Sequence, residues 1–129
     1  MKKILCYLSI LLFFFQCKYG PVFKATDTNN GSTFDINKGE FFTVSLKAQL
    51  STGFSWNADL SDESIIMQKG KPETISLEKK KETKTGGFEL QQFTFKGIKK
   101  GSTELILNYS QLWIKKDPIK VYKININVK

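Results

Sequence analysis

The sequence contains no histidine and no arginine, and its 129 residues include only two cysteines and three prolines. Without histidine, the chain cannot form a Ser-His or Cys-His nucleophile pair or an imidazole zinc site. It also lacks the side chain whose ordinary pKa lies near neutral pH. Paired carboxylates or a lysine remain as catalytic groups, so catalysis is disfavoured rather than excluded. We expect a binding protein that is not an enzyme and that needs no metal and no cofactor.

The positive charge of the chain comes entirely from lysine. The 20 lysines outweigh 12 acidic residues and give a formal net charge of +8. A basic domain is a candidate for nucleic-acid binding, but arginine, which supplies bidentate contacts to phosphate and guanine, is missing. Lysines scattered along strands more often keep sheet edges solvated. We therefore predict no nucleic-acid partner.

An apolar run near the N-terminus indicates export. Lys2 and Lys3 form a short positive start, and an uncharged run from Ile4 to Phe15 follows. This run fits the apolar core of a secretory signal peptide and is shorter than the roughly 20 residues of a membrane-spanning helix. We predict a signal peptide over residues 1–16 and a single domain, expected to be a monomer, over residues 17–129.

Cys17 follows directly after this run, as the lipid-attachment cysteine of a bacterial lipoprotein does. The preceding residues, Phe14-Phe15-Gln16, lack the small residue that usually stands before such a cysteine, so lipid attachment and simple cleavage nearby both remain open. Cys6 lies within the predicted signal, so the mature chain has no internal disulfide and its core must supply the stability. We expect an exported protein that is periplasmic, secreted or tethered to a membrane through lipid on Cys17.

Short segments of alternating apolar and polar residues, separated by Gly, Asn, Asp and Lys turns, predict an all-β fold. The apolar residues alternate over 42–46, 105–109 and 122–128. Over residues 88–95 the apolar parity changes between Leu90 and Phe93, which predicts a bulge or a strand with two apolar faces. Seven or eight strands in one domain favour an immunoglobulin-like, two-sheet antiparallel sandwich, with a closed barrel as the alternative.

Three stretches contain residues that a plain sandwich does not explain. Segment 1 (residues 49–56) contains Ser51-Thr52-Gly53-Phe54 and Trp56, and we expect Trp56 to be buried. Segment 2 (residues 84–88) contains Gly86-Gly87-Phe88. Segment 3 (residues 111–118) contains Gln111-Leu112-Trp113, in which the tryptophan is either a core residue or a binding anchor. The nearby lysine run at 79–81 is interpreted as a solvated hairpin tip.

Taken in this order, the three segments resemble the chagasin family of cysteine-peptidase inhibitors. That family shows Asn-Pro-Thr-Thr-Gly-Tyr/Phe, Gly-x-Gly-Gly and Arg-Pro-Trp in three loops at one end of an immunoglobulin-like sandwich. The resemblance extends from about Gly39 to Val128. This sequence departs from the pattern with Gln49-Leu50 in place of Asn-Pro, Lys84 in place of the first glycine, and Gln111-Leu112 in place of Arg-Pro.

The resemblance implies a reversible inhibitor of papain-like cysteine peptidases whose three loops fill the active-site cleft. Thr52-Gly53 would lie nearest the catalytic thiol, Gly86-Gly87 along one wall of the cleft and Trp113 against the other. The implied peptidase-binding residues are Ser51, Thr52, Gly53, Phe54, Gly86, Gly87, Phe88, Gln111, Leu112 and Trp113. The lost prolines and arginine are expected to affect affinity more than the mode of binding. The alternative is a surface adhesin or carbohydrate-binding module, in which Trp113 and Phe54 would stack on a sugar.

Overall fold

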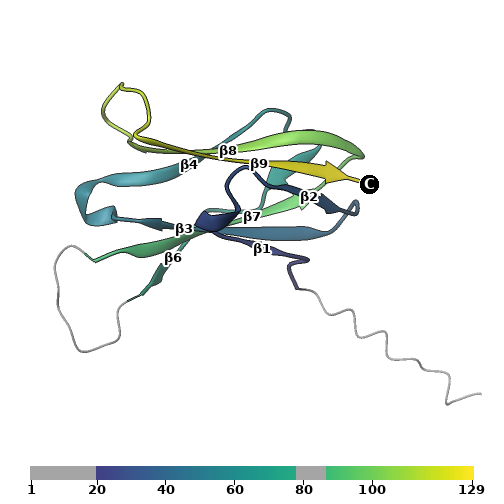
Figure 1. Cartoon of the computed structure of the whole chain (residues 1–129), viewed down its shortest axis with the longest axis horizontal. Helices are drawn as coiled ribbons and strands as arrows, with labels where there is room; N and C mark the ends of the chain where they lie inside the picture. Colours follow the sequence, from purple (N-terminus) through teal and green to yellow (C-terminus); the bar gives the residue numbers. More distant parts are fainter. Residues whose placement is uncertain (1–19, 78–86) are drawn as a thin grey trace, which may run out of the picture.

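Two β-sheets form from the alternating segments and pack face to face (Figure 1). The computed structural model describes residues 20–77 and 87–129. Within these ranges there are nine strands, two short 3-10 turns and no α-helix. The strands are β1 (Lys24–Ala25), β2 (Thr33–Ile36), β3 (Phe41–Ala48), β4 (Phe54–Leu60), β5 (Ile66–Gln68), β6 (Glu73–Ser76), β7 (Glu89–Gly97), β8 (Gly101–Gln111) and β9 (Lys120–Val128), and the 3-10 turns are η1 (Asp27–Asn29) and η2 (Leu50–Thr52).

The predicted two-sheet sandwich is confirmed, with two differences in detail. The first sheet has the order β1-β3-β7-β5, with β6 also paired to β7, and the second has the order β2-β9-β8-β4. The described chain has nine strands rather than seven or eight, because β1 and β5 are too short to show an alternating pattern. Both sheets are mixed rather than antiparallel, since β1 is parallel to β3 and β2 is parallel to β9.

The core lies between the sheets and consists of the inward residues of the long strands. Its largest fully buried side chains come from β3, β5, β7, β8 and β9, as the alternation in most of these strands predicts. They are Phe42, Val44, Leu46, Ile66, Phe93, Phe95, Leu105, Leu107, Ile124 and Ile126. This core holds the two sheets together, and there is no disulfide among the described residues. The ends of the long strands extend directly from this core.

The change of apolar parity in β7 marks a two-faced strand and not a bulge. The pairing of β7 with β3 is continuous along the whole strand, so no extra residue is inserted. Gln91 lies on the buried face in line with Phe93, whereas Leu90 lies on the other face beside Ile75 of β6. Because the polar Gln91 occupies an inward position, the alternation of apolar residues in β7 could not be recognised from the sequence.

The strand register places segments 1 and 3 at one end of the sandwich. Ala48 at the end of β3 pairs with Glu89 at the start of β7, so residues 87 and 88 reach the same end. Phe54 at the start of β4 pairs with Gln111 at the end of β8. The C-terminus and the β7–β8 turn lie at the opposite end (Figure 1). Stretches about 25 to 60 residues apart in the chain therefore meet at one surface.

Candidate functional site

Segment 1 folds into the short 3-10 turn η2 followed by a left-handed glycine. The amide of Thr52 donates to the carbonyl of Gln49 at 3.1 Å, and the amide of Gly53 donates to the carbonyl of Leu50 at 2.9 Å. Gly53 has φ +82° and ψ −2°, the left-handed conformation that ends the turn. A residue with a side chain adopts this conformation only at a cost, so the position favours glycine. The turn leaves Ser51 and Thr52 exposed at its tip.

The base of segment 1 is held by one residue from each sheet. The amide of Gln49 donates to the hydroxyl oxygen of Tyr109 in β8 at 2.9 Å. The amide of Leu50 donates to a carboxylate oxygen of Glu89 in β7 at 3.3 Å. Two backbone donors of the turn are thereby satisfied, and the turn is fixed to both layers of the sandwich. Sequence reasoning identified Tyr109 as an inward residue but had no signal for its hydrogen bond or for Glu89.

Trp56 supports segment 1 from within the core, as predicted. It is buried, and its ring packs against Tyr109 at 4.9 Å between centroids. Its indole N–H donates to the carbonyl of Lys47 at 2.9 Å, and its backbone amide donates to the side-chain oxygen of Gln91 at 2.7 Å. The inward Gln91 is therefore a hydrogen-bond partner for an edge strand. Phe54 is half-buried, and its ring stacks on the same Tyr109, with 5.4 Å between the ring centroids.

Segment 3 follows the end of β8 and presents two large apolar side chains to solvent. Leu112 is 70% exposed and Trp113 is 68% exposed. The segment turns back through hydrogen bonds from the Ile114 amide to the Gln111 carbonyl and from the Ile119 amide to the Tyr109 carbonyl. Of the two alternatives for Trp113, the core residue is therefore excluded. An exposed tryptophan beside an exposed leucine is typical of a contact surface.

Segments 1 and 3 touch at Gly53 and Trp113. A β-carbon placed on Gly53 would lie 1.9 Å from Cη2 of the Trp113 indole and 2.7 Å from its Cζ2. The ring therefore rests against the α-carbon of the glycine. In addition, the side-chain amide of Gln111 donates to the carbonyl of Thr52 at 3.0 Å. These contacts join the two segments into one ridge, which is called the ridge below and comprises residues 51–53 and 111–113.

Segment 2 is described only at its end. Gly86 and the lysine run at 79–81 lie outside the described residues. Gly87 is half-buried, and Phe88 is 51% exposed just before β7. A hollow of about 680 Å³ adjoins Phe88 and is lined in part by Trp56, Tyr109 and Lys120. Phe88 lies at the same end of the sandwich as the ridge. The hollow extends from there toward η1, and its lining is mixed, since it also includes Asp27, Asn30 and Lys47.

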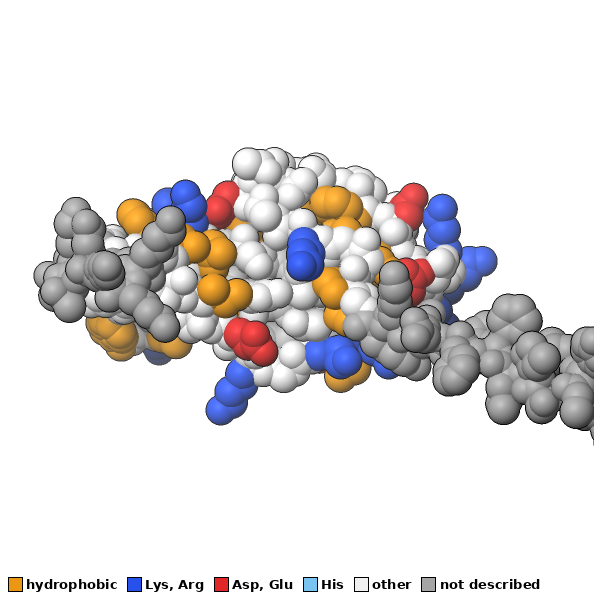
Figure 2. All heavy atoms as spheres, turned by 90° about the horizontal axis from the view of Figure 1, so that it is seen from below, with side chains coloured by type: hydrophobic (Ala, Val, Ile, Leu, Met, Phe, Trp, Pro, Cys, Tyr) orange, Lys and Arg blue, Asp and Glu red, His pale blue; other side chains and the backbone are white. Residues whose placement is uncertain are grey.

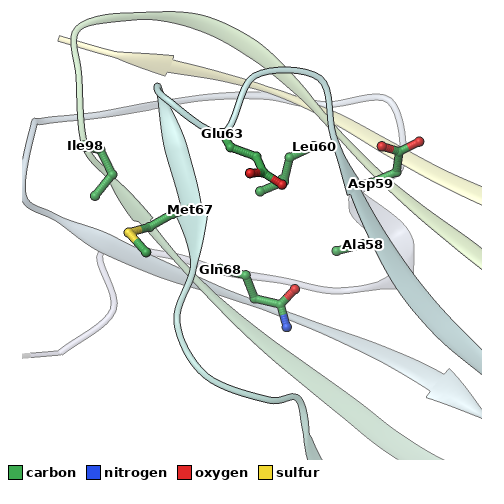
Figure 3. A pocket seen from close by; sticks show the side chains of 7 residues that line it. All are labelled: Ala58, Asp59, Leu60, Glu63, Met67, Gln68 and Ile98. Atoms are coloured by element: carbon green, nitrogen blue, oxygen red, sulfur yellow. The ribbon is translucent and has the colours of Figure 1, made fainter.

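Two other parts of the described surface lie away from the ridge. The face over the first sheet shows small apolar areas interspersed with lysines and acids (Figure 2). A hollow of about 380 Å³ lies between β4 and β5, toward the end opposite to the ridge (Figure 3). Its lining residues are Ala58, Asp59, Leu60, Glu63, Met67, Gln68 and Ile98. Among residues 20–77 and 87–129, no three metal-ligating side chains gather, and no helix is long and apolar enough to span a membrane.

The perturbed carboxyl groups also lie away from the ridge. A hydrogen bond from Asn127, and then the charge of Lys129, lower the pKa of Asp35 below its ordinary value. Hydrogen bonds from Ser64 lower the pKa of Asp62 in the turn after β4. Both groups serve local structure at the far end of the sandwich. The ridge itself is built from neutral side chains, so its chemistry is that of shape and apolar contact.

Comparisons with known proteins agree with this picture. The family model of the chagasin family peptidase inhibitors, I42, matches residues 35–128. The chain is 24% identical to amoebiasin-2 of Entamoeba histolytica over 103 residues, which are 79% of this chain and 81% of amoebiasin-2. The fold is similar to that of EhICP2, a cysteine protease inhibitor from Entamoeba histolytica, with a TM-score of 0.71, 21% identity and coverage of 85% of this chain and 100% of that one. It is also similar to PbICP-C, solved in complex with falcipain-2, with a TM-score of 0.52, 18% identity and coverage of 82% and 89%.

Proposed function

We propose that this chain, which belongs to the chagasin family of peptidase inhibitors (I42), reversibly inhibits papain-like cysteine peptidases by filling their active-site cleft. The observation that carries the proposal is the contact of Trp113 with Gly53, which joins segments 1 and 3 into one exposed ridge. A ridge of this kind blocks a cleft by occupying it. The chain itself contributes no reacting group, in keeping with its lack of histidine.

Each part of the ridge has a separate task in this proposal. The tip of η2, with Ser51 and Thr52 exposed, enters the cleft above the catalytic thiol and keeps substrate away from it. Leu112 and Trp113 lie against one wall, and Phe88 approaches the other, where each loses water from its apolar surface. Large apolar side chains in such positions carry most of the affinity of an interface. One copy of the chain holds all three segments, so we propose that a monomer binds one peptidase.

Gly53 has a structural task of its own in this proposal. The resemblance places Thr52-Gly53 nearest the catalytic thiol. In the structure, the space beside its α-carbon is occupied by the indole of Trp113. Gly53 therefore provides the seat for Trp113 and allows the left-handed turn. Its backbone is presented to the enzyme only together with the tryptophan.

The proposal is tested by inhibition of papain and several related peptidases with the purified chain. We expect reversible, competitive inhibition, which Trp113→Ala weakens about thirtyfold, or roughly 2 kcal/mol, with unfolding unchanged because the side chain is mainly exposed. Met67→Ala is the control, because Met67 is 46% exposed on β5, away from the ridge. Absence of inhibition by the unaltered chain at micromolar concentration would contradict the proposal. So would equal inhibition by the two variants.

The family match gives no support to the adhesin or carbohydrate-binding alternative. The sequence features that indicate export lie outside the described residues. Export remains our proposal, with lipid attachment to Cys17 and simple cleavage nearby as the two alternatives. The amide of Val22 donates to the carbonyl of Phe41, which pairs with Lys96 at the end of the sandwich opposite to the ridge. A tether before Val22 would leave the ridge free to meet a peptidase. The mass of the mature protein distinguishes a lipid-modified Cys17 from an unmodified or cleaved chain.

A further inference from the structure

Gln111 differs from its neighbours in segment 3 because its side chain binds segment 1. It is the last residue of β8, it is half-buried, and it pairs with Phe54. Its side-chain amide donates to the carbonyl of Thr52 at 3.0 Å, across 59 positions of sequence. The next two residues, Leu112 and Trp113, are both more than two-thirds exposed. One N–H of the Gln111 side chain is thus directed to segment 1.

The carbonyl that Gln111 binds belongs to the residue before Gly53. Trp113 rests on Gly53 itself, so two consecutive residues of segment 1 are held by two residues of segment 3. One contact is a directed hydrogen bond and the other is a fit of an indole ring to a bare α-carbon. Together they hold the tip of the η2 turn in one position relative to Trp113.

These contacts matter because neither segment is stiffened by proline at its entry. Gln49-Leu50 precede the turn, and Gln111-Leu112 precede the tryptophan. Any backbone freedom left in the free protein must be lost on binding, at a cost in conformational entropy. A ridge that is already assembled in the free inhibitor avoids part of that loss.

We propose that Gln111 is a positioning residue that holds segment 1 in its binding shape and makes no essential contact with the peptidase. This inference rests on the proposed function. Uncoupling segment 1 from segment 3 lowers the fraction of molecules that are ready to bind, and the apparent affinity falls in proportion. The effect is therefore expected in the association rate constant. A lost direct contact would instead raise the dissociation rate constant, as most interface substitutions do.

The kinetic test compares Gln111→Met with Gln68→Met. Methionine keeps the length of the side chain and removes the donor. Gln68 is the matched control, since its side-chain amide also donates to a backbone carbonyl, that of Gly70 at 3.1 Å, away from the ridge. We expect Gln111→Met to slow association with a papain-like peptidase about fivefold to tenfold, with dissociation changed less than about twofold. The inference is overturned by an unchanged association rate or by a loss that lies mainly in dissociation.

A second measurement needs no peptidase. In the free protein, the α-protons of Gly53 lie against the Trp113 ring and should carry a ring-current shift in the NMR spectrum. Gln111→Met should move these shifts toward those of the Trp113→Ala variant, while Gln68→Met should leave them unchanged. Unchanged shifts in Gln111→Met would refute the positioning role even if the chain inhibits. If the unaltered chain inhibits no peptidase, the proposed function fails, and the NMR result still decides whether Gln111 holds segment 1.

Discussion

Substitution of Gly53 by alanine tests the link between segments 1 and 3 most directly. Two costs are expected. The first is the left-handed backbone at φ +82°, which costs a residue with a side chain about 1–2 kcal/mol. The second is the collision of the new methyl group with the Trp113 indole, 1.9 Å away, against the ~3.5 Å of an ordinary carbon–carbon contact. The ring is mainly exposed, so it moves aside rather than unfolding the domain.

Gly39→Ala separates the two costs. Gly39 has φ +89°, and a β-carbon there would meet nothing within 4 Å. Both variants should therefore lose about 1–2 kcal/mol of unfolding free energy, measured by urea denaturation. Only Gly53→Ala should weaken inhibition, by at least about tenfold, because only it displaces the Trp113 anchor.

The assay is a titration of a papain-like peptidase with each variant, evaluated as an inhibition constant. A double-mutant cycle adds a further check. In the Trp113→Ala background the ring is gone, so Gly53→Ala should have a smaller effect on inhibition than in the unaltered chain. Equal inhibition by Gly53→Ala and Gly39→Ala, or strict additivity in the cycle, would refute the reasoning that the glycine seats the indole.

Two further predictions concern buried polar side chains of the sandwich. Gln91→Met should lower the free energy of unfolding in urea by about 1–3 kcal/mol, because the amide of Trp56 loses its 2.7 Å partner in a buried place; an unchanged urea midpoint would argue against this role. Burial, and then the charge of Asp27, raise the pKa of Tyr122 to about 12 from 10.0, so the fold favours the neutral phenol. This contribution to the free energy of unfolding is fully present below pH 10 and is lost as the pH rises toward about 12. Tyr122→Phe should remove it. Urea unfolding at a series of alkaline pH values should then show a smaller dependence of the unfolding free energy on pH than in the unaltered chain.

Much of the fold could be predicted because strand alternation is a local property. At alternate positions over residues 105–109 of β8 and 122–128 of β9 the residues are apolar, and these residues are buried in the structure. The prediction was less complete where a strand was short, as in β1 and β5, or where a polar residue took an inward position, as at Gln91. In each case the deciding factor was a neighbouring strand: β3 beside β1, β7 beside β5, and Trp56 of β4 opposite Gln91.

The two tryptophans show which part of the site could be predicted from local sequence and which part could not. Trp56 follows Phe54 in an alternating strand, so its inward position could be predicted, and it is buried. Trp113 stands in a turn without any periodic pattern, and composition left core and surface equally open. Its exposure depends on where β8 ends and β9 begins. That is a consequence of the pairing of Tyr109 with Lys120, which the residues around Trp113 do not encode.

From the sequence alone we could predict an all-β fold with a sandwich favoured over a closed barrel, the inward faces of most long strands, the lack of histidine chemistry and the order of the three segments. The tertiary structure alone decided that Trp113 rests on Gly53, that Gln111 binds Thr52, and that Tyr109 and Glu89 hold the base of the turn. The physical reason is the range of the interactions. Alternation follows from the two-residue repeat of a single pleated strand. Contacts between residues about 40 to 60 positions apart follow from sheet register and side-chain direction, which are settled only when the whole core packs.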